Sequence, residues 1–336
     1  MKRALYILIS LIIFNSCESS NELEGVWIGA YQIHYSSNEP SLSSMRELLD
    51  FSSNQIIYKS FDYPSLEEKD TIKAFKYSLK DNKLIFDSDT FLIKKITQDS
   101  LVLSYYSTYK RDLVFKRIIK RDKKINIELK EKAFRIIGPN YSDSIDFITD
   151  SLILNIGNVF NTNYRLTKWA INSYKSFDFL VFDHFDSPPL LIEKSSENEI
   201  LLKLFHTSIQ DFKMTKIEKK NEISGIVGNW VWPFQDGQGF PLPPPPLSYP
   251  ENIDTKLYLR IRTDSIEIEQ YGKVRSEKWK LNSTNGFIYF PEKLKTKYGV
   301  WKILKLNRDE LIIERNIRFY SRDKEKIKFK KIINSR

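Results

Sequence analysis

The chain has 336 residues and a formal net charge of +10 at pH 7, and 41% of its residues are hydrophobic and 14% aromatic. This apolar content excludes global disorder, and the length suits two or three hydrophobic cores better than one. The basic residues are interspersed with acidic ones, so we interpret them mainly as solvated strand faces, with attraction to anionic lipids or envelope polymers as the alternative. No nucleic-acid recognition motif is present, and we expect no nucleic-acid partner.

The N-terminus has the pattern of a secretion signal. Lys2 and Arg3 are followed by a run from Ala4 to Phe14 that is apolar apart from Ser10. A transmembrane helix needs about 20 apolar residues. The shorter run is typical of the apolar region of a signal peptide.

The stretch Phe14-Asn15-Ser16-Cys17 resembles the lipobox of bacterial lipoproteins, and Cys17 is the only cysteine in the chain. The resemblance implies that residues 1–16 are removed, that Cys17 carries the lipid, and that residues 17–22 form an acylated tether. Glu18 replaces the Asp of an inner-membrane retention signal, which favours lipid anchoring in the outer membrane, facing either the periplasm or the outside. The alternative is an ordinary cleaved signal followed by a free cysteine.

Three similar segments of about 100 residues follow. Each contains a Lys-aromatic-x-aliphatic block, and each ends in an acidic turn followed by two strands of alternating apolar and polar residues. Such alternation predicts half-buried β-strands. We predict three tandem antiparallel β units of about eight strands each, lipocalin-like up-and-down barrels, at residues 23–120, 121–222 and 223–336. The blocks are Lys76-Tyr77-Ser78-Leu79, Lys168-Trp169-Ala170-Ile171 and Lys278-Trp279-Lys280-Leu281.

The first and third units open on Gly-x-Trp, as Gly25-Val26-Trp27 and Gly228-Asn229-Trp230. This opening resembles that of lipocalin-like domains in secreted bacterial lipoproteins. The resemblance implies that Trp27 and Trp230 pack across the closed end of each barrel, against Arg117 and Lys331 of the last strand. These four are structural residues of the barrel base. The middle unit has no such motif, so we predict a divergent unit whose barrel can be open.

Candidate ligand contacts follow from strand alternation and from a proline-rich loop. Alternation places Tyr31 on the face of Trp27, and Trp232 and Phe234 on the face of Trp230. The loop at residues 237–250 follows the Gly-x-Trp strand of the third unit and would cross the barrel mouth as a lid or a docking surface. The alternatives are a filled, dry barrel and a stiff loop without a ligand. The apolar loop residues are Phe240, Leu242, Leu247 and Tyr249.

Catalytic signals are weak. The three histidines, His34, His184 and His206, do not have metal-ligand spacing. Asp183-His184-Phe185-Asp186 is the one local cluster of suitable residue types, and it resembles a turn. We therefore expect neither an enzyme nor a bound metal or cofactor.

The sequence predicts a lipid-anchored envelope protein that binds a small apolar ligand or an envelope partner. The alternative is a structural or accessory subunit of an outer-membrane assembly. A cavity of a few hundred cubic ångströms lined by aromatic side chains favours the ligand carrier, whereas filled barrels with an exposed apolar patch favour the subunit.

Overall fold

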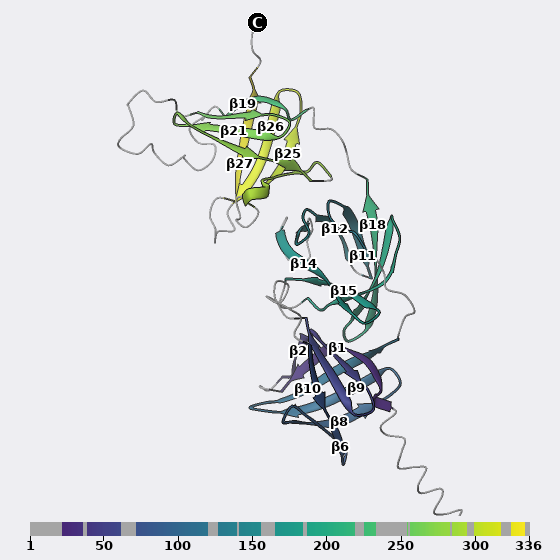
Figure 1. The fold of residues 1–336 in the computed structure, drawn as a ribbon. Helices are drawn as coiled ribbons and strands as arrows, with labels where there is room; N and C mark the ends of the chain where they lie inside the picture. The colour runs from purple at the N-terminus through teal and green to yellow at the C-terminus, as the bar shows by residue number, and fades with distance from the viewer. Residues whose placement is uncertain are drawn as a thin grey trace, which may run out of the picture. The chain divides into compact units, whose positions relative to one another are not determined.

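The computed structural model contains three antiparallel β-sheets that follow one another along the chain (Figure 1). The prediction of an all-β protein with three tandem antiparallel units is confirmed. The structure describes residues 22–35, 39–61, 72–119, 127–139, 141–155, 165–183, 187–218, 225–232, 254, 256–282, 284–293, 299–316 and 324–332. The predicted signal peptide, Cys17 and most of the predicted tether lie outside these ranges.

The first sheet has ten strands: β1 (Gly25–His34), β2 (Ser41–Ser44), β3 (Glu47–Phe51), β4 (Gln55–Ser60), β5 (Ile72–Lys76), β6 (Ser78–Lys80), β7 (Lys83–Phe86), β8 (Asp89–Ile96), β9 (Ser100–Tyr106) and β10 (Lys110–Ile118). Their order is β5-β4-β3-β1-β10-β9-β8-β7-β6, and β2 also pairs with β1. The first and last strands of the unit are thus hydrogen-bonded neighbours, as in an up-and-down barrel.

The second sheet is a closed barrel of β11 (Ala133–Gly138), β12 (Tyr141–Phe147), β13 (Leu152–Asn155), β14 (Arg165–Tyr174), β15 (Phe177–Phe182), β16 (Leu190–Ser195), β17 (Glu199–Phe205) and β18 (Ile209–Ile217). The expectation that this unit can be open was wrong. Its interior is filled by apolar side chains such as Phe134, Phe147, Leu180 and Met214.

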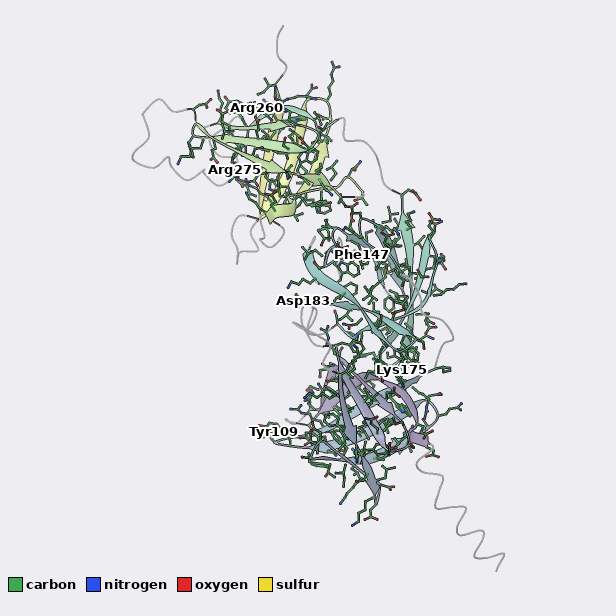
Figure 2. The ribbon with its side chains drawn as sticks, in the orientation of Figure 1. Tyr109, Phe147, Lys175, Asp183, Arg260 and Arg275 are labelled. Carbon is green, nitrogen blue, oxygen red and sulfur yellow. The ribbon has the colours of Figure 1, made fainter. Side chains whose placement is uncertain are left out.

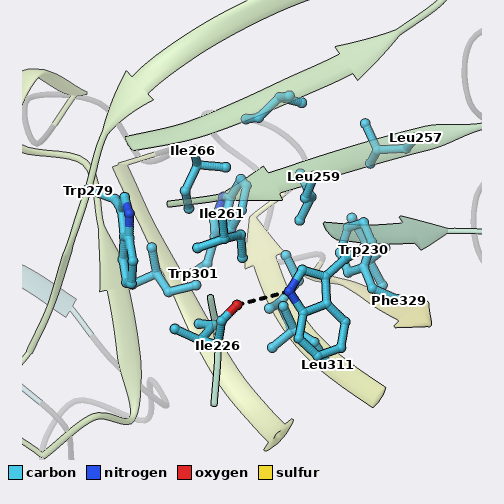
Figure 3. Close-up of a cluster of buried hydrophobic side chains, with 14 of the residues drawn as sticks. Ile226, Trp230, Leu257, Leu259, Ile261, Ile266, Trp279, Trp301, Leu311 and Phe329 are labelled. Atoms are coloured by element: carbon cyan, nitrogen blue, oxygen red, sulfur yellow. Dashed lines mark hydrogen bonds between the residues drawn. The ribbon is translucent and has the colours of Figure 1, made fainter. Parts of the chain in front are cut away.

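The third sheet comprises β19 (Gly228–Trp232), β20 (Leu257–Ile261), β21 (Ser265–Gln270), β22 (Lys273–Lys278), β23 (Lys280–Leu281), β24 (Phe287–Tyr289), β25 (Val300–Leu306), β26 (Glu310–Asn316) and β27 (Lys324–Lys331), with a 3-10 turn, η2, at Pro291–Lys293. The strand order is β22-β21-β20-β19-β27-β26-β25-β24-β23. Figure 3 shows its core, in which Trp230, Leu259, Leu311 and Phe329 gather between the strands.

The outer sheets end, and the middle sheet continues, at the same position, which a single aromatic residue occupies in each unit. In the first sheet the order begins at β5 and ends at β6, and only Tyr77 separates these strands in the chain. Trp279 separates β22 from β23 in the same way. In the second sheet, residues 165–168 of β14 pair with β13 and residues 169–174 pair with β15, so one continuous strand changes partner at Trp169 and the barrel is closed.

These three aromatic residues belong to the repeated Lys-aromatic-x-aliphatic block, and they make the same contact. Each donates a side-chain hydrogen bond to the backbone carbonyl at the start of an earlier strand-connecting turn, and the bond satisfies a group that the turn leaves unpaired. The pairs are Tyr77 Oη to Ser52 (2.9 Å), Trp169 Nε1 to Thr149 (3.2 Å) and Trp279 Nε1 to Arg262 (2.9 Å).

The Gly-x-Trp segments form the base of the two outer sheets. The guanidinium carbon of Arg117 lies 4.1 Å from the Trp27 ring centroid, and Lys331 Nζ lies 5.2 Å from that of Trp230. Both distances lie in the cation–π range. Each Trp Nε1 also donates to the backbone carbonyl four residues earlier, at 2.8 Å and 2.9 Å.

The glycines of these segments have a steric reason. Gly25 and Gly228 have φ values of +121° and +149°, which side chains rarely adopt. A Cβ at either position would lie 2.9 Å from the cation, at Arg117 Nη1 or Lys331 Cε. A larger residue would therefore strain the backbone and require the cationic side chain to shift.

The first two sheets share a buried cluster, to which β1 contributes Val26 and Ile28 and β15 contributes Phe177 and Phe179. Residues 1–130 and 134–216 accordingly form one compact unit, and residues 131–133 and 217–336 form another.

A buried polar contact accompanies the shared cluster. Tyr174 Oη donates to Asp50 Oδ2 at 2.6 Å, and Lys175 pairs with the same carboxylate. Burial, together with the hydrogen bond to Asp50, raises the pKa of Tyr174 strongly. The tyrosine is therefore a neutral donor throughout the physiological range.

Candidate binding cavity

A cavity of about 380 Å³ lies inside the first sheet. It is bounded by β1, β3, β4, β5 and β7 to β10, together with Met45 and residues of the β7–β8 turn. Its lining combines six aromatic residues with apolar and charged side chains. The lining residues are Gln32, Met45, Glu47, Leu49, Tyr58, Lys73, Phe75, Phe86, Asp87, Asp89, Phe91, Leu103, Tyr105, Arg111, Leu113 and Phe115.

Strand register orders part of this lining in rows. Across β8, β9 and β10, Phe91 pairs with Tyr105, and Tyr105 pairs with Arg111. Two residues further toward the base, Leu103 pairs with Leu113. The cavity is therefore apolar on its inner side, and the guanidinium lies in the outer row.

The aromatic side chains form a stacked wall. Phe86 and Phe91 lie with centroids 4.9 Å apart and planes 13° apart, and Phe91 and Tyr105 lie 5.1 Å and 28° apart. Phe75 contacts Phe86 at 6.0 Å in a tilted arrangement. The faces of these rings therefore stack against one another. Together the rings offer a large, rigid apolar contact area to a bound molecule.

The polar groups of the outer row differ in their partners. Tyr105 Oη donates to Asp89 Oδ1 at 3.2 Å, and this hydrogen bond raises the pKa of Tyr105. By contrast, Arg111 Nε is buried and has no hydrogen-bond partner among the described residues. A buried donor without a partner is energetically costly, and Arg111 provides one such donor among the lining residues.

Tyr31 does not line this cavity, and the predicted face was wrong. A β-bulge between Gly29 and Tyr31 shifts the pairing of β1 with β10, so alternation changes sides at that point. Gln32 takes the inward position instead. Tyr31 packs against the cluster shared by the first two sheets, with its ring centroid 5.8 Å from that of His206.

The other candidate ligand contacts belong to the third unit. Trp232 is 5% exposed and packs within the core of that sheet. The proposed lid lies outside the described residues, as do Phe234, Phe240, Leu242, Leu247 and Tyr249.

Sequence reasoning did not identify the cavity residues of β10, although the strand contains a signal for them. With Arg117 beside Trp27 on the interior face, alternation along β10 puts Phe115, Leu113 and Arg111 on the same face. The structure places all three in the lining. The same signal is interrupted in β1 by the bulge, which no residue pattern announces.

The two described histidines have different partners. His34 Nε2 lies 3.0 Å from Ser43 Oγ, and His206 Nδ1 lies 3.3 Å from Thr207 Oγ1. His184 lies outside the described residues. In the part of the chain that the structure describes, no group of three or more His, Cys, Asp or Glu could hold a metal ion. Across the same residues, no helix combines the length and apolarity needed to cross a membrane.

No protein-family model matches the chain, and no curated protein is significantly similar to it in sequence. A transferrin binding protein B from Haemophilus parasuis is 7% identical, with a TM-score of 0.17 over 91% of this chain and 75% of that one. The isotype 1 transferrin binding protein B from serogroup B Neisseria meningitidis is 11% identical, with a TM-score of 0.18 over 92% of this chain and 75% of that one. The H. pylori beta clamp in complex with 5-chloroisatin is 7% identical, with a TM-score of 0.17 over 94% of each chain. TM-scores this low establish neither a shared architecture nor a shared function.

Proposed function

We propose that this protein is a bacterial envelope lipoprotein, anchored in the outer membrane through Cys17, whose first β unit binds a small, largely apolar molecule without chemical conversion. The observation that carries the proposal is the aromatic-lined cavity of about 380 Å³ inside the first sheet. Small-molecule pockets are typically about 300–1,000 Å³ and mostly apolar, with a few placed polar groups.

The base geometry supports a lipocalin-like unit. Trp27 and Arg117 lie in contact at one end of the first sheet. The cavity begins next to this base, at Phe115, and extends along β10 to Arg111. In a lipocalin-like barrel the ligand enters from the end opposite the tryptophan. The proposal therefore assigns the ligand to the first unit, rather than to the proline-rich loop of the third.

The N-terminal pattern supports the location. A short apolar run ending at the only cysteine of the chain is what lipid modification requires. Acyl chains then hold the mature protein at the membrane, and more than one chain is needed for stable anchoring.

One experiment tests both parts. Protein purified from its own host is examined by mass spectrometry, first denatured and then under native conditions. We expect the denatured mass to show loss of residues 1–16 and addition of acyl chains at Cys17. We expect the native mass to exceed it by that of one small molecule.

A matched pair of variants locates that molecule. Leu113→Trp fills the cavity, because Leu113 faces inward on β10. Leu92→Trp makes the same change on β8 at an exposed position, 38% accessible. The first variant should lose the bound molecule and the second should keep it. Retention by both variants, or a wild-type protein that carries only a protein partner, would favour the accessory-subunit alternative.

A further inference from the structure

We infer that the molecule held in the first unit carries a carboxylate or a similar small anionic group, bound by Arg111 at the outer row of the cavity. This inference rests on the proposed function and adds the chemical class of the ligand. It follows from the partners of the charged side chains that line the cavity.

Two cationic side chains line the cavity, Lys73 and Arg111, and Arg111 has a buried donor without a partner. Arg111 Nε is buried without a hydrogen bond, and no carboxylate among the described residues forms an ion pair with Arg111. Guanidinium groups match carboxylates in a two-point geometry and form stronger hydrogen bonds with them than with neutral acceptors. Arg111 belongs to the cavity lining, so a ligand carboxylate inside the cavity would reach its guanidinium group.

Two of the three acidic side chains in the lining are already engaged. Asp89 accepts from Tyr105 Oη, and Glu47 Oε2 accepts from the backbone N–H of Arg46 at 2.9 Å. The third, Asp87, lies exposed in the β7–β8 turn with φ at 49°. The acidic groups therefore do not form a preorganised cation site.

The central ring of the aromatic wall is not open to a cation. A cation–π site needs an open ring face. Phe91 stacks between Phe86 and Tyr105, so its two neighbours occupy that ring. What the wall offers is apolar contact area, which suits an aryl or short alkyl group.

The rows set the orientation of the ligand. Arg111 lies in the outer row with Tyr105, and Leu103 and Leu113 lie in the next row toward the base. The anionic group would thus bind near the mouth, and the apolar group would point inward against Leu103, Leu113 and Phe115.

Three probes of one shape and different charge test this inference: phenylbutanoate, phenylbutanamide and phenylbutylamine. Full-length acylated protein in phosphatidylcholine nanodiscs is titrated with each probe by calorimetry, with empty nanodiscs as the blank. We expect the carboxylate to bind tightest and the amine weakest. Arg111→Gln should weaken carboxylate binding by about tenfold, the loss of one charge-assisted contact, and should leave amide binding nearly unchanged.

Two further variants separate a specific contact from general effects. Arg275→Gln makes the same change at an exposed position of β22, labelled in Figure 2, and should not alter the order of the probes. Arg111→Lys keeps the charge without the planar fork and should give an intermediate affinity. Circular dichroism verifies that each variant is folded.

The outcomes are distinguishable. If the amine binds at least as tightly as the carboxylate, or if Arg111→Gln weakens all three probes equally, the anionic class is wrong while the cavity still binds ligand. If none of the probes binds the wild-type protein, the cavity fails as a binding site, and this inference fails with it.

Discussion

At the residue scale, a buried carboxylate holds together the outer face of the first sheet beside the cavity. Asp112 is 5% exposed and accepts hydrogen bonds from Lys94 Nζ (2.6 Å), Ser104 Oγ (2.7 Å) and Tyr35 Oη (2.9 Å). Burial raises the pKa of Asp112, but these hydrogen bonds and the charge of Lys94 outweigh burial and lower it below the ordinary value. The ionised form is thus favoured in the folded protein.

This predicts an acid-dependent stability. Because the folded pKa of Asp112 is depressed, its contribution is complete above the unfolded value of about 3.9 and is lost as the pH falls through the folded pKa. Asp112→Asn should lower the free energy of unfolding by about 1–2 kcal/mol at pH 7. In urea titrations the difference from wild type should shrink below about pH 4. The exposed Asp309→Asn serves as the charge control, and a pH-independent difference would contradict the account.

Residue roles were predictable where they followed from strand alternation alone. The pairs of Trp27 with Arg117 and Trp230 with Lys331 were expected, and the structure places each pair in contact. Tyr31 was misplaced because one extra residue in a strand reverses the faces of all that follow. Local bulges depend on pairing across the sheet, which a single strand does not reveal.

At the element scale, the repeated aromatic residue ties each unit to its own earlier turn. Trp279 Nε1 donates to the carbonyl of Arg262, 17 positions earlier, at the point where β20 gives way to β21. The hydrogen bond lies where the chain changes its partner strand, from β21 along β22 to β24 along β23. The sequence predicted the repeated block and the strands, but not the role of its aromatic side chain.

We expect Trp279→Phe to destabilise the third unit more than Trp301→Phe does. Both tryptophans are buried in the same core, and Trp301 has no hydrogen bond from its side chain among the described residues. The difference should be about 1 kcal/mol, the net worth of one hydrogen bond. Urea unfolding of the two variants measures it. Equal losses would show that ring packing alone accounts for the repeated aromatic residue.

At the scale of the whole molecule, the three units are not equally independent. The first and second share the cluster of Val26, Ile28, Phe177 and Phe179, and the buried contact of Asp50 reinforces it. On β15, residues 177–181 are all buried, as expected for a strand that is covered on both faces. The number and order of the units were predictable, whereas their shared core and the closure of the middle barrel depend on contacts between distant segments.

Fragments test this organisation. Residues 223–336 should unfold cooperatively on their own, because that sheet has its own core. Residues 22–119 alone would expose the side of the shared cluster that contains Val26 and Ile28. They should therefore be less stable than the same segment within residues 22–216. Equal stability of residues 22–119 in the two fragments, measured by urea unfolding, would show that the shared cluster contributes nothing.

Whether the first unit carries a ligand can be seen in a crystal structure of the protein purified from its own host. We expect continuous density for one small molecule inside the first sheet, with an apolar part against Leu103 and Leu113 and an anionic end within hydrogen-bond reach of Arg111. A cavity filled by water or by rearranged side chains, in protein purified without denaturation, would contradict this expectation.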